Sequence, residues 1–223
     1  MLAQSLKLPR SGIDNFVEYE SGMSKFETFS SLISPDKKVC PYYIVYTFDN
    51  IFRKLAHNPK KFLSAHIKEG DVVTDIGCGI GYFSIPMAKL VGPKGKVFSV
   101  DLQAKMLEGV RKRAKKANVL NRICFHQVTQ NNIDLKQGLD FALAFWVIHE
   151  VPDTKMYLTQ IIKQLKPGAK FLFAEPIIHV DQKHFSAIKN LCLEVGFKVL
   201  NEPKIFFSRA VLLVKPYDIA ARN

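Results

Sequence analysis

The sequence has little cysteine and no closely spaced cysteine pair. Its four cysteines, Cys40, Cys78, Cys124 and Cys192, are scattered along 223 residues. Zinc ribbons and small disulfide frameworks need Cys-x-x-Cys pairs or a dense cysteine pattern. Neither class of protein fits this chain, so we expect free thiols and no metal site.

Long apolar runs are also missing. No stretch of the chain approaches the roughly 18 uninterrupted apolar residues of a membrane-spanning helix. Lys7, Pro9 and Arg10 interrupt the first residues, which therefore lack the apolar core of a secretory signal. We expect a protein without a membrane span, located in the cytoplasm.

Acidic residues are fewer than basic ones. The chain has 20 Asp and Glu against 32 Lys and Arg, a formal net charge of +12 that favours anionic partners. The densest basic cluster is 111–116, where no aromatic residue interleaves the charges to stack on bases. The cluster is therefore more typical of a solvated helix face than of a nucleic-acid surface, although nucleic acid stays a possible partner.

Strand-like and helix-like segments alternate along most of the chain. Apolar, β-branched runs occur at 71–76, 97–100, 122–128, 139–146 and 170–174. Helical patterns occur near 82–91, 103–117, 153–165 and 181–195. This alternation predicts βαβ units and a parallel sheet covered by helices on both faces. The last two apolar runs have no helix between them and predict an antiparallel hairpin at 197–201 and 205–214.

The N-terminal part of the chain differs from the rest. Residues 1–38 are polar and interrupted by proline and glycine, and we expect an appendage or lid there. Residues 39–223 then form a single domain. Within it, 42–68 predicts two helical pieces, the second opening at Pro59.

One glycine-rich turn follows the first predicted strand. The segment VVTDIGCGIGYFSI, residues 72–85, places Gly77, Gly79 and Gly81 directly after a strand that ends near Asp75. Glycines allow a ligand to approach the backbone closely, and the following helix directs its N-terminus to the same place. The segment predicts a ligand site at the carboxyl end of the sheet.

The residues around this turn indicate which ligand it binds. Tyr82 stands where a dinucleotide-binding turn would have its third glycine, and the Lys-Ser or Lys-Thr of a P-loop is missing. Asp75 would repel a phosphate but could hold an ammonium group, directly or through water. Asp101 ends the second predicted strand, 20 residues beyond Gly81, where a carboxylate accepts hydrogen bonds from ribose hydroxyls. A ribose and an amino acid without a diphosphate describe S-adenosylmethionine.

Three motifs carry a resemblance to the class I S-adenosylmethionine-dependent methyltransferases. They are DIGCGIG at 75–81, VFSVD at 97–101 and LKPGAKFLFAEP at 165–176. Within this family the chain looks most similar to the small-molecule branch that includes the ubiquinone, menaquinone and arsenite methyltransferases. The resemblance implies an α/β, Rossmann-like sheet of seven strands in the order 3-2-1-4-5-7-6, with the last strand antiparallel and helices on both faces.

The resemblance also implies which residues contact the cofactor. A polar residue after the third strand would bond the adenine, and of Gln130, Asn131 and Asn132 we favour Asn131. Leu102 could flank the adenine or belong to the core, and Trp146 ends the fourth strand where cofactor and acceptor meet. The predicted cofactor-binding residues are Asp75, Gly77, Cys78, Gly79, Gly81, Asp101, Leu102, Asn131 and Trp146.

Four titratable residues follow the fourth and fifth predicted strands. His149 and Glu150 are candidates for a general base acting on an acceptor hydroxyl or acidic carbon. A structural role is the alternative, because methyl transfer from a sulfonium can proceed by orientation alone. His179 is a weaker candidate, and Glu175 is more typical of a pocket wall or a structural group.

These observations predict an enzyme that transfers a methyl group from S-adenosylmethionine to a small-molecule acceptor. Trivalent arsenic is disfavoured as the acceptor because it needs several thiolates brought together, and the cysteine spacing does not provide them. Two alternatives stay open. One is an RNA methyltransferase, which steep salt dependence of nucleic-acid binding would reveal, and the other is a non-catalytic protein that binds the cofactor or a partner.

Overall fold

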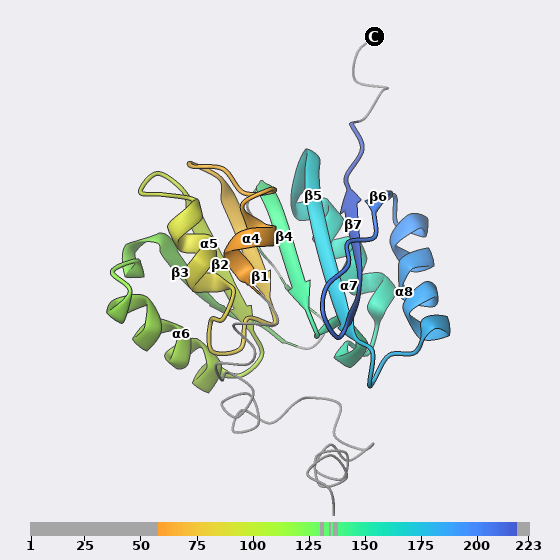
Figure 1. Ribbon diagram of the computed structural model, residues 1–223, viewed down its shortest axis with the longest axis horizontal. Helices are drawn as coiled ribbons and strands as arrows, with labels where there is room; N and C mark the ends of the chain where they lie inside the picture. The colour runs from red at the N-terminus through yellow and green to blue at the C-terminus, as the bar shows by residue number, and fades with distance from the viewer. Residues whose placement is uncertain (1–57, 130–131, 134, 136–137, 218–223) are drawn as a thin grey trace, which may run out of the picture. The chain divides into compact units, whose positions relative to one another are not determined.

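The computed structural model describes residues 58–129, 132–133, 135 and 138–217, and they form a seven-stranded sheet with the order β3-β2-β1-β4-β5-β7-β6 (Figure 1). Strand β7 is antiparallel to β5 and to β6, whereas β1, β2, β3, β4 and β5 pair in parallel. The predicted strand order and the predicted antiparallel strand are therefore confirmed. The strands are β1 (Val72–Ile76), β2 (Lys96–Asp101), β3 (Ile123–Gln127), β4 (Leu139–Phe145), β5 (Leu165–Pro176), β6 (Lys198–Asn201) and β7 (Ser208–Val214).

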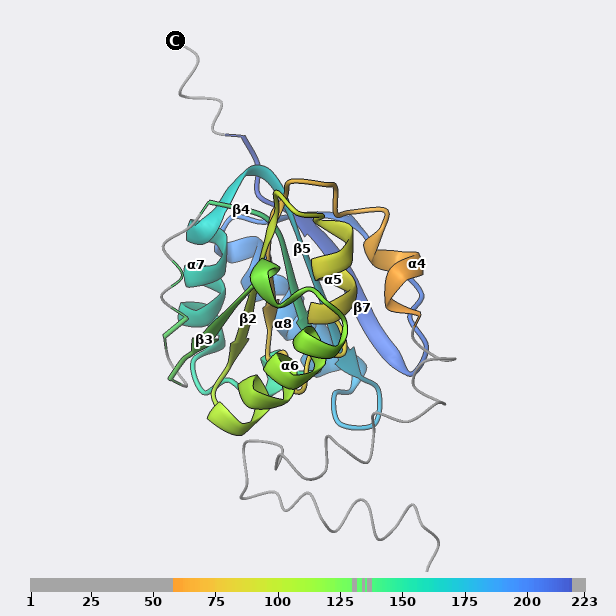
Figure 2. The same ribbon diagram turned by 90° about the vertical axis from the view of Figure 1, so that its left-hand side faces the viewer.

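Helices cover both faces of this sheet. One face carries α4, α5 and α6 and the other carries α7 and α8, as Figure 2 shows with the sheet turned nearly edge-on. Four predicted helices are confirmed within two residues at each end: α5 (Ser84–Leu90), α6 (Ala104–Lys116), α7 (Thr154–Gln164) and α8 (Gln182–Glu194). Helix α4 (Pro59–Leu63) opens at Pro59 as predicted but ends before the predicted limit of 68, and the other helical piece predicted within 42–68 lies outside the described residues. The short 3-10 helices are η1 (Leu120–Arg122) and η2 (Ile148–Glu150).

Strand β5 shows why an apolar run such as residues 171–174 has no polar side chain on either face. Phe171 and Phe173 pack against α7 and α8, whereas Leu172 and Ala174 belong to the cluster beneath α4, α5 and α6. All four side chains are buried. Because successive side chains of a strand point to opposite faces, a segment covered on both faces tends to be apolar at consecutive positions.

Further element boundaries differ from the sequence prediction, and β7 begins at Ser208, three residues after the predicted start at 205. Strand β5 begins at Leu165, five residues before the predicted run, because Leu165 pairs with Leu139 across a bulge and Gly168 N donates to the Lys215 carbonyl at 2.8 Å. Helix α5 begins at Ser84 instead of Tyr82, since the turn continues through Phe83. The predicted domain boundary near residue 38 lies outside the described residues and stays a prediction.

Two surface features bear on possible partners. In the described part of the chain, no helix combines the length and apolarity that crossing a bilayer requires.

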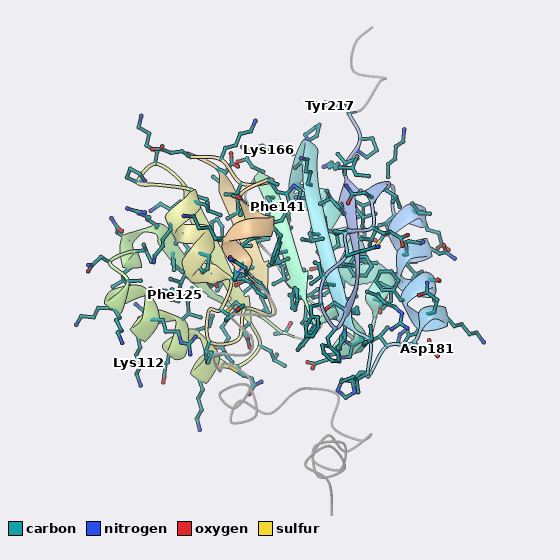
Figure 3. The ribbon with its side chains drawn as sticks, viewed as in Figure 1. Lys112, Phe125, Phe141, Lys166, Asp181 and Tyr217 are labelled. Carbon is teal, nitrogen blue, oxygen red and sulfur yellow. The ribbon has the colours of Figure 1, made fainter. Side chains whose placement is uncertain are left out.

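On α6 the basic side chains of Arg111, Lys112, Lys115 and Lys116 are exposed, and Figure 3 shows Lys112 projecting outward. The Arg111 guanidinium lies 4.2 Å from the centroid of the Phe125 ring, a cation–π contact that the sequence alone does not reveal.

Phe171 tests the packing between β5 and the α7–α8 layer. It is fully buried and contacts the rings of Phe173 and Phe197. We expect Phe171→Ala to lower the free energy of unfolding by about 3–5 kcal/mol, because the truncation leaves a cavity that the sheet cannot close. Urea denaturation measures this loss. The control Leu120→Ala, at a side chain that is 37% exposed, should change stability by less than about 0.5 kcal/mol, and equal losses for both would contradict the packing described here.

Candidate functional site

The glycine turn joins β1 to α5 at the carboxyl end of the sheet. Gly77, Gly79 and Gly81 all have left-handed backbone conformations, with φ of +65°, +51° and +86°. A Cβ atom at Gly77 would lie 2.5 Å from Cγ2 of Val147, in the segment after β4. The turn therefore passes so close to the neighbouring strand end that only glycine fits at this position.

Asp101 connects the end of β2 to this turn. Its Oδ2 accepts a hydrogen bond from Gly79 N at 2.9 Å and its Oδ1 accepts one from Gln103 N at 2.9 Å. Only 8% of the residue is exposed. Burial raises the pKa of the carboxyl to about 6, although hydrogen bonds from the backbone amides of Gln103, Gly79 and Leu102 act in the opposite direction. The structure thus brings together the predicted turn and the predicted ribose-binding acid.

Asp75 lies beneath the turn. It is 1% exposed, and its Oδ2 accepts a hydrogen bond of 2.5 Å from the hydroxyl of Ser84, the first residue of α5. The carboxylate therefore ties the end of β1 to the start of the helix. Its predicted contact with a ligand ammonium group stays a prediction.

The other predicted cofactor residues surround the same strand ends. Cys78 is buried, and burial together with the charges of Asp101 and Asp75 raises the pKa of its thiol, which stays neutral. Leu102 follows Asp101 and is half-buried, with its carbonyl accepting a hydrogen bond from Gln127 Nε2 at 3.2 Å. Asn131 lies outside the described residues.

Trp146 is held in a strained conformation at the end of β4. Its φ is +62°, which is rare for a bulky residue and costs conformational energy. Its backbone N donates to the Ala174 carbonyl at 2.8 Å and its Nε1 donates to the Ser208 hydroxyl at 2.9 Å. These bonds fix the side chain between β4, β5 and β7, and strain of this kind is typical of functional sites.

His149 and Glu175 form a pair that the sequence did not reveal. Glu175, the penultimate residue of β5, is fully buried. Its Oε2 bonds His149 Nδ1, and its Oε1 accepts from Ile148 N at 2.9 Å. An acid at the end of the apolar run FLFAE is expected to be buried and to need a hydrogen-bond partner. This requirement was the only sign in the sequence that Glu175 is paired. Glu175 therefore has a structural role, one of the two that the sequence favoured, and the charge of Glu150 also acts on His149.

Electrostatics around His149 favour its protonated form. Burial acts to lower the pKa of His149, but the hydrogen bond and charge of Glu175, with the charge of Glu150, raise it above the ordinary value. The exposed His179 ring lies 6.3 Å from the His149 ring and is nearly parallel to it. Burial and the charge of His149 lower the pKa of His179.

Metal ligands do not gather at this site. Across the described ranges, no three His, Cys, Asp or Glu residues are grouped so that they could hold a metal ion. Cys78 and Cys192 belong to clusters on opposite faces of the sheet, so they cannot join in binding a thiophilic atom such as arsenic. Cys40 lies outside the described residues.

The strand order, the glycine turn and the acid that ends β2 together define the class I S-adenosylmethionine-dependent methyltransferase fold. A family model described as "Methyltransferase domain" matches residues 67–210. The chain belongs to this family.

Comparison with individual proteins agrees with this assignment. The chain is 30% identical over 148 residues to a demethylmenaquinone methyltransferase from Lactobacillus johnsonii, covering 63% of this chain and 61% of that protein. It is 24% identical over 145 residues to a ubiquinone/menaquinone biosynthesis C-methyltransferase from Pasteurella multocida, covering 63% and 54%. The chain therefore spans less than two thirds of the length of these curated relatives.

A solved structure shows the same fold. A SAM-dependent methyltransferase from Aquifex aeolicus superposes with a TM-score of 0.71 at 21% identity, covering 79% of this chain and 100% of the other. At this identity the likeness establishes the architecture alone.

Two glycine variants separate backbone strain from steric fit in the turn. Gly77→Ala adds a Cβ that meets Val147 in a left-handed conformation, so we expect a loss of about 2–4 kcal/mol in stability. Gly70 has a φ of +89° with nothing within 4 Å of its Cβ position, and Gly70→Ala should cost only about 1 kcal/mol. Urea denaturation of both variants measures the difference. Equal losses would show that the approach of the turn to Val147 is not tight.

Proposed function

We propose that this chain binds S-adenosylmethionine and transfers its methyl group to a small-molecule acceptor. The observation that carries the proposal is the buried Asp101 carboxylate, which holds the glycine turn through Gly79 N. The cofactor supplies a methyl group made electrophilic by a positively charged sulfur. The role of the protein is to bind and orient both reactants, which removes much of the entropic barrier to transfer.

The residues present fit a ribose and an amino acid at this turn. Asp101 accepts hydrogen bonds from backbone amides through both oxygens, and a carboxylate with about four lone pairs keeps acceptor capacity for a ribose hydroxyl. The turn offers bare backbone at Gly77 and Gly79. The nearby acid Asp75 disfavours a phosphate there.

The relatives support a small acceptor. Those aligned above are named for quinone methylation, and the segments beside His149 expose the apolar side chains of Ile177, Ile178, Phe206 and Phe207. A cytoplasmic location remains part of this proposal.

Calorimetric titration of the full chain tests the cofactor. We expect micromolar binding of S-adenosylmethionine and S-adenosylhomocysteine and no binding of NAD at matched salt. Labelled methyl transfer into a metabolite extract then tests the activity. Failure of folded protein to bind either sulfur compound would contradict the proposal, and binding without transfer to any extract component would favour a non-catalytic role.

The buried Asp101 predicts how binding depends on pH. Because its pKa is about 6, the carboxyl loses its charge as the pH falls through that value and becomes a weaker acceptor. We expect the affinity for S-adenosylhomocysteine to fall about tenfold between pH 8 and pH 5. Asp101→Asn should bind weakly with little change over this range, because an amide has one acceptor oxygen for two backbone amides. A similar pH dependence in the variant would assign the effect to another group.

A further inference from the structure

The carboxylate of Glu175 is fully buried, and both of its oxygens are used. Oε1 accepts from Ile148 N and Oε2 bonds His149 Nδ1, so the group holds two consecutive residues of η2. A buried carboxylate needs such partners because desolvation strongly disfavours an unpaired charge. The arrangement fixes the His149 ring relative to the end of β5.

This contact selects one form of the imidazole. An ionised carboxylate can only accept hydrogen bonds, so the proton of the neutral ring must lie on Nδ1. The lone pair is then on Nε2, for which no hydrogen bond is found among the described residues. The His149 side chain is 19% exposed, so the ring is partly accessible.

The charged groups facing His149 come from three elements. Glu175 lies on β5, Glu150 lies on η2 and His179 lies in the segment after β5. Against the effect of burial, the two acids raise the pKa of His149. The neutral ring is therefore a stronger base than an ordinary histidine, and the proportion of neutral ring grows as the pH rises through the raised pKa.

Apolar side chains are exposed where β5 ends and the antiparallel β7 begins, at the same edge of the sheet as Glu175. We define the apolar rim as Ile177, Ile178, Phe206 and Phe207, which are 43–58% exposed. Ile177 N donates to the Phe207 carbonyl at 3.2 Å, and the two phenylalanine rings contact each other with centroids 4.4 Å apart. Phe207 has a φ of +52°, a strained conformation for a bulky residue. The rim therefore presents ordered apolar surface beside His179 and His149.

We propose that Glu175 is a positioning residue that keeps Nε2 of His149 available as a base, and that the methyl acceptor is an apolar ring compound carrying a hydroxyl group. This inference rests on the proposed function and names its acceptor class. The apolar rim suits the ring, and the basic nitrogen suits the hydroxyl.

The transfer step balances with these groups. The hydroxyl proton of the acceptor moves to Nε2 of His149, which becomes an imidazolium stabilised by Glu175. The electron pair of the acceptor oxygen forms the new bond to the methyl carbon. The bond between that carbon and the sulfonium sulfur breaks, and its electrons remain on sulfur as a neutral thioether.

Nitrogen NMR of histidine-labelled full-length protein tests the positioning role without any acceptor. In the wild type we expect His149 to carry its proton on Nδ1 when neutral. In Glu175→Gln the amide can donate to Nδ1, so the proton should move to Nε2 and the pKa of His149 should fall. Glu194→Gln, at an exposed acid on α8, is the matched control and should change neither. An unchanged tautomer in Glu175→Gln, or a change produced by Glu150→Gln instead, would overturn the role of Glu175.

Methyl transfer to defined probes tests the acceptor class. Phenol, 1-naphthol and 1,4-dihydroxybenzene are the hydroxyl probes, and 1-naphthylamine, which attacks without first losing a proton, is the comparison. We expect transfer to a hydroxyl probe with a rate that rises with pH through the His149 pKa. His149→Gln should lower kcat by about 100-fold or more, the usual contribution of a general base. Glu175→Gln should lower kcat and move the midpoint of the pH profile downward.

Binding of S-adenosylhomocysteine to every variant separates this inference from the proposed function. Protein that binds this compound but methylates no hydroxyl probe, or methylates one equally well after His149→Gln, overturns the acceptor class or the base while the cofactor assignment stands. Loss of binding in the wild type itself would instead overturn the proposed function.

Discussion

Burial of carboxylates at strand ends is the constraint on which the site depends. Asp75, Asp101 and Glu175 end or nearly end β1, β2 and β5, and each is at most 8% exposed. Because an unpaired buried carboxylate is costly, each must find hydrogen-bond donors. Asp75 accepts a hydrogen bond from the hydroxyl of the first residue of α5. Asp101 accepts from amides of the glycine turn and of the residue before α6. Glu175 bonds a backbone amide and the histidine ring of η2. These three carboxylates therefore determine the course of the loops at the carboxyl end of the sheet.

Much of the fold could be predicted from the sequence because its signals are local. The alternation of apolar runs with helical patterns predicted β1 to β5 and α5 to α8, and the two last apolar runs predicted the hairpin of β6 and β7. Asp153 and Asp181 cap α7 and α8 by accepting hydrogen bonds from backbone N atoms three residues on. The order of the strands came from the resemblance to a family, since periodicity carries no information about which strands are neighbours. The early start of β5 was missed because its pairing partner, Leu139, lies 26 residues away in sequence.

Part of the candidate site could be predicted from the sequence, and part could not. The glycine turn and Asp101 were identified because strand ends of a parallel sheet meet at one edge, and the structure joins them through Gly79 N. The pairing of His149 with Glu175 was not predicted, because the two residues are 26 positions apart in the sequence. Long-range hydrogen bonds depend on the registry of β4 and β5, which places Phe145 beside Ala174, and the sequence offers no signal for that registry.

Strand β6 determines how the edge of the sheet meets other protein chains. It forms one edge of the sheet, all four of its residues are exposed, and its pairing with β7 is irregular between Val199 and Asn201. An exposed edge is a template on which a second chain can add a strand. The short length, the break in register and the charge of Lys198 make this edge a poor template. These features of β6 therefore disfavour aggregation by strand addition at this edge of the sheet.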